Sequence, residues 1–249
     1  MPDMNSILKR MFAILFMVIV FCETSYTQSN IALRNYISAA EQAMNNNRAN
    51  DAIMQLKHAA RIAPENFVPC YLLGQVYVSL NDYNNAAKYC RDALNSIDAN
   101  TISQKFFECY GRNVNVSYRK VMTNMYDVLA IHYKNVGQIG LAKRYNNLNI
   151  QLNIASGYKA PVASSLQRMY SCYAEEGNWS ECLKYFSEIQ MTIPHGDAWE
   201  MCDAVCHAAM GDCYAKLGRE IETIREYQRA AKLGHLGARQ VLKNMGLTY

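Results

Sequence analysis

The sequence predicts an all-α fold of about five antiparallel helix hairpins, followed by one more helix. Three observations support this class. Downstream of residue 27, no segment shows the strict apolar–polar alternation of a half-buried strand. Apolar residues recur instead at helical spacing. The helical pattern also repeats with a unit of 34 residues, as expected for stacked supersecondary units. The five units begin at Leu33, Phe67, Thr123, Ala163 and Ala204.

The first 27 residues are expected to be a signal peptide. Lys9 and Arg10 precede an apolar run from Met11 to Phe21, and small and polar residues follow it. This run is too short to cross a bilayer as a helix, which takes about 20 residues; the alternative is a buried N-terminal helix. Bacterial lipoprotein signals carry a small residue before the cysteine. Phe21 precedes Cys22, so the sequence argues against a lipid anchor there.

Export predicts a periplasmic or secreted protein with no stable membrane span after cleavage. The composition is that of a folded chain, with 51% apolar residues and no low-complexity tract. The net charge is +4, and Lys and Arg form no run longer than two residues. A nucleic-acid partner is therefore not expected, because it requires a clustered basic face.

Three positions of the repeat are expected to hold each hairpin together. Two antiparallel helices approach closely where both carry small residues, so positions 8 and 20 stay small. A ring at position 11 fills the space beside that contact. Position 8 is Ala40, Gly74, Ala130, Tyr170 and Gly211; position 20 is Ala52, Ala86, Ala142, Cys182 and Thr223; position 11 is Ala43, Tyr77, Tyr133, Tyr173 and Tyr214.

Position 15 is expected to end the first helix of every unit. A helix that stops and reverses commonly ends in a left-handed residue, which Gly adopts freely and Asn tolerates. All five units carry Gly or Asn there. Position 15 is Asn47, Asn81, Gly137, Gly177 and Gly218.

These units resemble tetratricopeptide repeats. Unit two matches that pattern best, with Leu73, Gly74, Tyr77, Tyr83, Ala86 and Ala93. The end of unit five, from Ala230 to His235, also looks like the related Sel1-like repeat. The resemblance covers residues 33–237 and implies a right-handed superhelical solenoid whose first helices line a concave face.

The expected organisation follows from the spacing of the units. Residues 28–100 hold repeats one and two, and residues 123–237 hold repeats three to five. Residues 101–122 are expected to be an irregular insertion, with the first helix of unit three extending back to about Ser117. Asp197 and Glu200 have capping-box spacing at the start of unit five. Residues 238–249 are expected to form a capping helix that shields the last repeat.

The resemblance implies that the concave face binds a protein or peptide partner, whose identity the sequence does not give. Positions 2, 5, 9 and 12 fall on one helical stripe that lines this face. The predicted groove residues are Arg34, Ile37, Glu41, Tyr71, Gln75, Asp127, Lys134, Gln167, Ser171 and Asp212. The alternative is a solvated face with no ligand. The Lys, Asn and Arg clamp that grips chaperone tails is absent, since unit one has Arg34 and Ser38 at the corresponding places.

Eight cysteines follow residue 27, and they allow a second hypothesis. Buried thiols, disulfides and a metal site are all compatible with their number. Cys206, Met210 and Cys213 lie on the stripe that packs on the previous unit, which favours buried thiols. No phosphate loop, nucleophile elbow or zinc-protease pair is present, so neither an enzyme nor a bound cofactor is expected. The sequence thus predicts an exported scaffold or adaptor; the alternative is a thiol-rich metal-binding or redox-active envelope protein.

Overall fold

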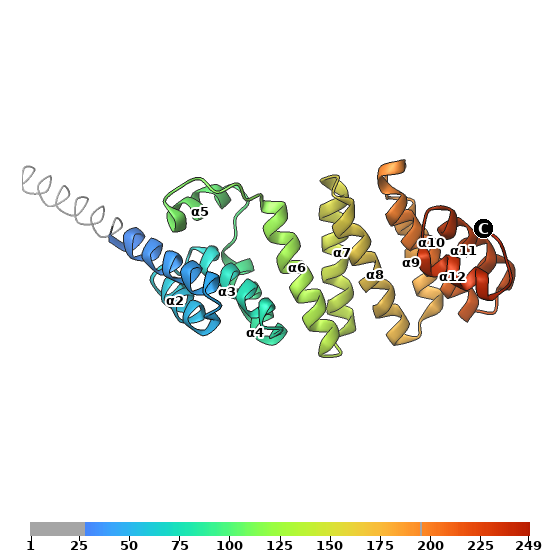
Figure 1. Cartoon of the computed structure of the whole chain (residues 1–249), viewed down its shortest axis with the longest axis horizontal. Coiled ribbons are helices and arrows are strands. Elements are labelled where there is room, and N and C mark those ends of the chain that lie inside the picture. Colours follow the sequence, from blue (N-terminus) through green and yellow to red (C-terminus); the bar gives the residue numbers. More distant parts are fainter. Residues whose placement is uncertain (1–27, 195) are drawn as a thin grey trace, which may run out of the picture. The chain divides into compact units, whose positions relative to one another are not determined.

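The computed structural model describes residues 28–194 and 196–249 (Figure 1). The predicted signal peptide, with Cys22, lies outside these residues. In the described part of the chain all regular elements are helices, and no strand is present. No helix in this part is long and apolar enough to cross a membrane. The predicted all-α class is therefore confirmed.

The chain divides into two compact parts, each of which contains more than one of the 34-residue repeats. They are called unit 1 and unit 2 below, and unit 1 ends at Tyr118. A helix that includes residues 28–45 opens the described part of unit 1. It is followed by α2 (Ala49–Ile62), α3 (Phe67–Ser79), α4 (Tyr83–Ser96) and α5 (Ile102–Tyr110). Helix α3 packs against α2 on one side and α4 on the other, so neighbouring repeats share one core.

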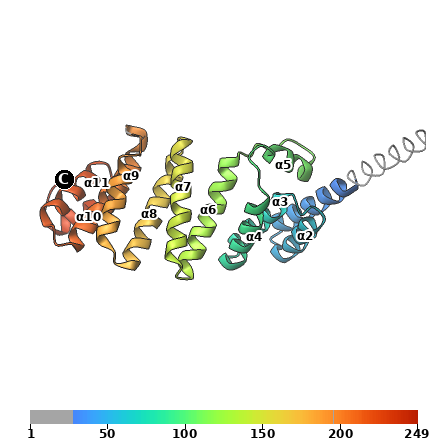
Figure 2. The same ribbon diagram turned by 180° about the vertical axis from the view of Figure 1, so that it is seen from behind.

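Unit 2 comprises Arg119–Tyr249 and continues the same alternation. Its elements are α6 (Tyr118–Asn135), α7 (Ile139–Ala155), α8 (Lys159–Glu176), α9 (Trp179–Gln190), the 3-10 turn η1 (Asp197–Trp199), α10 (Glu200–Lys216), α11 (Glu220–Lys232) and α12 (Leu236–Asn244). Helices α7, α8 and α9 stand side by side in chain order (Figure 2). Helix α8 also packs on α10, the first helix of the next repeat.

The predicted reversal at position 15 is confirmed in all five repeats. Asn47 and Asn81 both have φ of 57°, and the three glycines have φ between 68° and 73°. Gly177, for example, ends α8 in the left-handed conformation at φ 68°. The residue at position 15 therefore determines where the first helix of each repeat ends.

The rings at position 11 stack on rings that the repeat pattern had not singled out. Tyr77 lies parallel to Tyr89, with centroids 5.6 Å apart, and Tyr133 lies parallel to Tyr145 at the same distance. Tyr173 and Tyr185 are also paired, with centroids 5.7 Å apart, but their rings are tilted by 40°. The partner ring comes from position 23 of the second helix in each case. Stacked pairs of this kind link the two helices of a hairpin.

Position 8 packs closely, as predicted, but its main neighbour differs. A Cβ added at Gly74 would lie 2.9 Å from the Sγ atom of Cys90, at position 24. The nearest atom of Ala86, at the expected position 20, is its carbonyl oxygen at 3.5 Å. A Cβ at Gly211 would lie 2.8 Å from the ring of Tyr227, again at position 24. In these two hairpins the close contact is therefore between positions 8 and 24.

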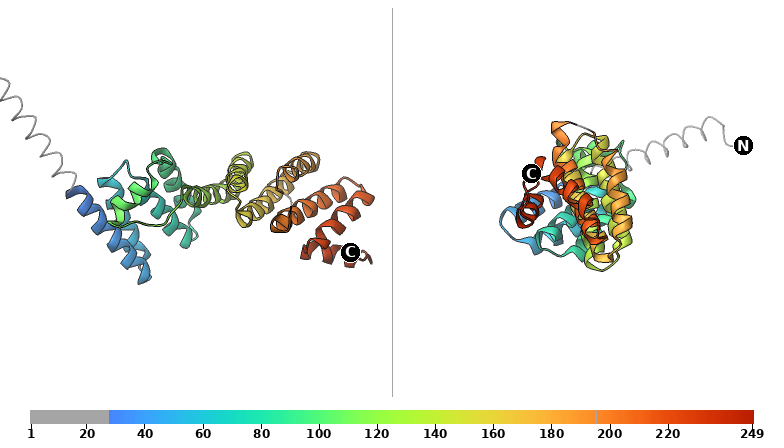
Figure 3. Two further views of the ribbon diagram at one scale, coloured as in Figure 1. Left: turned by 90° about the horizontal axis from the view of Figure 1, so that it is seen from above. Right: turned by 90° about the vertical axis from the view of Figure 1, so that its right-hand side faces the viewer.

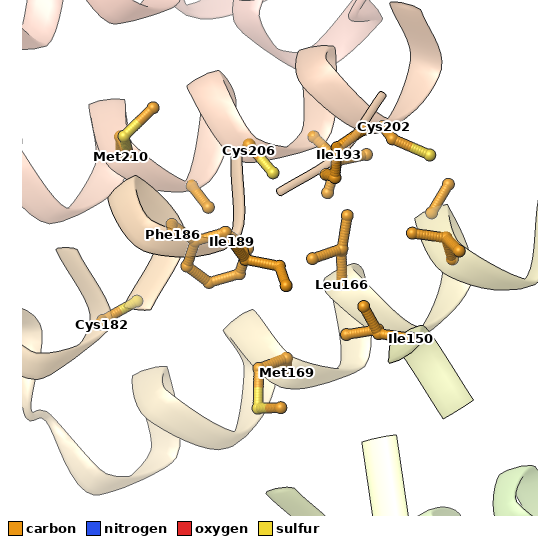
Figure 4. Close-up of a cluster of buried hydrophobic side chains, with 14 of the residues drawn as sticks. Ile150, Leu166, Met169, Cys182, Phe186, Ile189, Ile193, Cys202, Cys206 and Met210 are labelled. Carbon is orange, nitrogen blue, oxygen red and sulfur yellow. The ribbon is translucent and has the colours of Figure 1, made fainter. Parts of the chain in front are cut away.

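The largest described core of unit 2 joins α8, α9 and α10 (Figure 4). Leu166 and Phe186 are fully buried in it, together with Cys182, Cys206 and Cys213. Figure 4 shows side chains from the three helices directed into the same cluster. The stripe of α10 thus packs on the preceding repeat, and its cysteines serve as small apolar residues there.

A polar network connects α6, α7 and α8. The Asn153 amide donates to Thr123 Oγ1 at 2.9 Å and to Asn149 Oδ1 at 2.6 Å. Asn149 in turn donates to Asp127 Oδ1 at 2.5 Å, and Arg168 also donates to that carboxylate. Asn149 and Asn153 are fully buried. Their mutual hydrogen bonds allow these amides to occupy the interior, where an unpaired amide would be costly.

Two local expectations were wrong. The segment 101–122 is not irregular throughout, because it contains the nine-residue helix α5, which ends at the left-handed Gly111. Asp197 and Glu200 form no capping box: Asp197 begins η1, and α10 starts at Glu200 behind Trp199 without a side-chain cap. The last helix is present, and it begins at Leu236.

The start of α12 makes this helix sensitive to pH. The Nδ1 atom of His235 accepts a hydrogen bond from the Ala238 N–H at 3.1 Å. Only a neutral ring with a free Nδ1 accepts it, and burial lowers the pKa of His235, while Asp212 acts in the opposite direction. The neutral form is therefore favoured in the folded state. Its stabilisation is present above the unfolded pKa of about 6.5 and is lost as the pH falls through the lowered folded pKa.

We expect the His235→Asn variant to melt with less pH dependence than the unchanged protein. Asn also caps a helix but does not titrate, whereas protonated His235 loses a cap worth about 1 kcal/mol. Thermal denaturation between pH 7.5 and pH 5 measures the difference. An equal fall in melting temperature for both proteins would show that His235 does not cap α12 in solution.

Candidate partner-binding cleft

Three of the predicted groove residues meet at a cleft in unit 1. Ile37 and Glu41 come from the helix of residues 28–45, and Gln75 comes from α3. The cleft has a volume of about 370 Å³. Its other lining residues are Ala40, Met44, Asn45, Leu56, Leu72 and Val76. Most of the wall is apolar, and Glu41, Asn45 and Gln75 supply its polar groups.

The amide of Gln75 gives the cleft a directional feature. Its Nε2 atom is buried and has no hydrogen-bond partner among the described residues. Leaving such a donor unpaired costs about 1–3 kcal/mol. Because this nitrogen is closed to solvent in the free protein, the Gln75 side chain must rotate toward the cleft before a ligand carbonyl can accept one of its two donor hydrogens and remove this penalty.

Arg34 and Tyr71 do not line the open cleft, contrary to the groove prediction. Arg34 Nε donates to the Glu108 carbonyl oxygen at 3.2 Å, and its guanidinium lies over the ring of Phe107. Tyr71 is only 8% exposed and packs edge-on against Phe106. Helix α5 therefore covers this part of the predicted stripe.

Most of the predicted groove residues of unit 2 are engaged within the protein. Asp127 accepts hydrogen bonds from Arg168 and Asn149, and burial raises the pKa of this carboxyl, against the effect of Arg168. Lys134 Nζ donates to Ser171 Oγ at 2.5 Å. These residues bridge α6, α7 and α8 and so hold adjacent repeats together.

Asp212 is engaged in the same way, while Gln167 is exposed. The Asp212 carboxylate accepts a hydrogen bond from the Tyr227 hydroxyl of α11. Gln167 lines a separate cavity of about 660 Å³ between α8, α10 and the turn before α12. None of the other predicted groove residues reaches that cavity, so the cleft of unit 1 is the better candidate.

Sequence reasoning missed Leu56 and Leu72 as lining residues of the cleft. Leu56 belongs to α2, the second helix of its hairpin, and Leu72 is not on the predicted stripe. Both are apolar residues at helical spacing, so their sequence signal equals that of an ordinary core residue. Met44 is at position 12 of the first repeat, which belongs to the predicted stripe, and it lines the cleft.

The cysteines give no support to a metal or redox site. Of the described cysteines all but Cys70 are buried, and none is in a disulfide. Burial raises the pKa of Cys90 to about 12 and that of Cys202 to about 11. A raised pKa removes the thiolate that binds metal or reacts. Within residues 28–194 and 196–249, no group of three or more Cys, His, Asp or Glu side chains is placed to hold a metal ion.

Comparisons with known proteins agree with the repeat pattern. A family model described as a tetratricopeptide repeat matches residues 69–100, which span most of α3 and all of α4. The predicted Sel1-like character of the last repeat has no such match and stays a prediction. No curated protein sequence matches the chain.

Solved structures resemble the chain over most of its length. YrrB, described as a TPR protein with an unusual peptide-binding site, is 18% identical, with 84% of this chain and 90% of YrrB covered and a TM-score of 0.53. MamA is 15% identical, with 88% and 97% covered and a TM-score of 0.56. The chain therefore contains a tetratricopeptide repeat and has the fold of proteins built from such repeats.

Proposed function

We propose that this protein is an exported, non-enzymatic scaffold or adaptor that binds a peptide segment of a partner protein in the cleft of unit 1. The observation that carries the proposal is the unpaired Gln75 amide beside an apolar wall. An apolar side chain of the peptide fills the cleft, and a backbone carbonyl accepts from Gln75. This combination of apolar surface and a few placed polar groups is typical of ligand sites.

The similarity to a TPR protein described as having a peptide-binding site supports this proposal by analogy of fold alone. Export rests on the charged and apolar N-terminal segment of the sequence. N-terminal sequencing of the protein recovered from outside the cytoplasm tests it. A mature chain that retains Met1 would overturn the export hypothesis.

We expect the Gln75→Met variant to keep its melting temperature, or raise it slightly, while it binds the partner more weakly. Met has a similar length and removes a donor that is unpaired in the free protein, so folding loses no hydrogen bond. The complex loses one, which costs about 1 kcal/mol, or about fivefold in the dissociation constant. Denaturation curves and titration of the captured partner measure both effects.

The matched control is Gln42→Met, on the exposed side of the helix of residues 28–45. It should change neither quantity. The partner is first identified with a photo-crosslinking amino acid at position 44, inside the cleft. The same label at Met54, an exposed residue of α2, reports non-specific capture. Equal capture at both positions, or unchanged affinity of Gln75→Met, would move the site away from this cleft.

A further inference from the structure

Helix α5 packs against α3, the helix that carries Tyr71 of the predicted groove stripe. Figure 3 shows it in green over the blue and cyan helices of unit 1. Ile102, Phe106 and Cys109 are its buried apolar residues, and Phe106 is 3% exposed. The centroid of its ring lies 5.8 Å from that of Phe67 and 6.4 Å from that of Tyr71, both on α3. Both pairs have an interplanar angle of 72°, which is the edge-to-face geometry that aromatic rings favour.

The groove also holds polar groups of α5. Asn66 Nδ2 lies 3.1 Å from the Lys105 carbonyl oxygen and 3.1 Å from Glu108 Oε2, and it donates to both. Arg34 Nε donates to the Glu108 carbonyl oxygen at 3.2 Å. Two side chains of the repeats thus bind two main-chain carbonyls and one carboxylate. A separate peptide bound to this groove would be recognised by the same kinds of contact.

Helix α5 is not part of a repeat hairpin. It has nine residues, and an isolated helix of that length is marginal in water. Residues 97–101 and 111–117 on either side of it contain no helix. Helix α3 contacts α2 and α4 directly, and α5 contacts α3 from outside these pairs. Release of α5 therefore removes no contact between the helices of a hairpin, but it uncovers Phe67 and Tyr71.

One residue connects this groove with the cleft. Glu41 lines the cleft and hydrogen-bonds the Tyr110 side chain at the end of α5. Burial raises the pKa of Tyr110, and the carboxylate of Glu41 raises it further, so this hydroxyl stays protonated and donates. Glu41 therefore lies at the border between the cleft and the surface that α5 covers.

We propose that α5 is an internal ligand of this groove, and that the partner of unit 1 displaces it with an amphipathic helix that carries aromatic residues at i and i+4. Phe106 and Tyr110 supply these rings in α5, with centroids 6.2 Å apart. The inference rests on the proposed function, because it names the kind of partner that unit 1 binds and a regulation at the surface next to the cleft, which Glu41 borders.

The probe is a synthetic peptide of residues 101–111, kept reduced so that the buried Cys109 side chain is unchanged. It is titrated into the purified protein, into its Phe106→Ala variant and into a Ser103→Ala control, whose residue is on the exposed side of α5. We expect the Phe106→Ala protein to bind the peptide at least about tenfold more tightly than the unchanged protein. The tethered α5 competes at a high effective concentration until Phe106 is removed.

The Ser103→Ala protein should behave like the unchanged protein, and a peptide that itself carries Phe106→Ala should bind none of them. Hydrogen exchange of the unchanged protein gives a readout that does not depend on the folding of a variant. Amides of α5 should exchange at least about tenfold faster than those of α3 and α4, because α5 opens without unfolding a hairpin.

Two results would overturn the inference: no peptide binding by a folded Phe106→Ala protein, or protection of α5 equal to that of α3. Each leaves the proposed function testable by itself, since capture at position 44 does not depend on α5 as a ligand. Conversely, peptide binding by the Phe106→Ala protein with no specific capture at position 44 would contradict the proposed function but not the role of α5 as an internal ligand.

Discussion

The Gly74→Leu variant is expected to lose at least about 1–3 kcal/mol of unfolding free energy. Even a single added Cβ would lie 2.9 Å from Cys90 Sγ and 3.5 Å from the Ala86 carbonyl oxygen. Cys90 is fully buried, so its sulfur has no open space to enter. The rest of the Leu side chain must push α3 and α4 apart. Chemical denaturation measures the loss.

The matched control is Gly140→Leu. Gly140 is exposed in α7, and an added Cβ would have nothing within 4 Å. This change should be neutral or stabilising by up to about 1 kcal/mol, because Gly in a helix carries an entropic cost. Equal stability of Gly74→Leu and the unchanged protein would show that α3 and α4 are not packed in this register.

The Asn153→Leu variant is expected to lose about 2–4 kcal/mol, because it leaves several buried polar groups unpaired at once. Asn153 accepts a hydrogen bond from Arg119 Nη1 at 2.9 Å, and it donates to Thr123 Oγ1 and to the carbonyl and side-chain oxygens of Asn149. Leu has nearly the same size, so the loss reports hydrogen bonding more than packing. The change should be measured by chemical denaturation.

Gln151→Leu is the control for this experiment, since Gln151 is exposed on the same helix. It should stay within about 0.5 kcal/mol of the unchanged protein. The double change Asn149→Leu, Asn153→Leu should cost less than the sum of the two single changes, because both residues share one network. Strict additivity would argue that the two amides act separately.

The contact of Gly74 shows which part of the helix packing could be predicted from the sequence and which part could not. The small residue at position 8 was predicted from its recurrence, and the structure contains the close approach that it permits. Its neighbour is the side chain at position 24, however, and not the one at position 20. Which residues meet across two helices depends on their crossing angle and axial shift. A pattern within each helix does not contain either quantity.

The candidate site was likewise predicted only in part from the sequence. Ile37, Glu41 and Gln75 were predicted from their places on one stripe, and the cleft contains all three. The stripe could not show that Tyr71, one turn from Gln75, packs against Phe106. That contact joins residues 35 positions apart and requires a segment outside the repeat.

The sequence by itself determined the all-α class, the unit of 34 residues and the left-handed reversal at position 15. These features are local: helical periodicity and the conformational freedom of Gly and Asn are properties of a few consecutive residues. Only the tertiary structure decided that α5 occupies part of the groove and that Asn149 and Asn153 lie buried in one network. An insertion has no repeat to align with, and a buried amide is stable only when residues distant in sequence supply its hydrogen-bond partners.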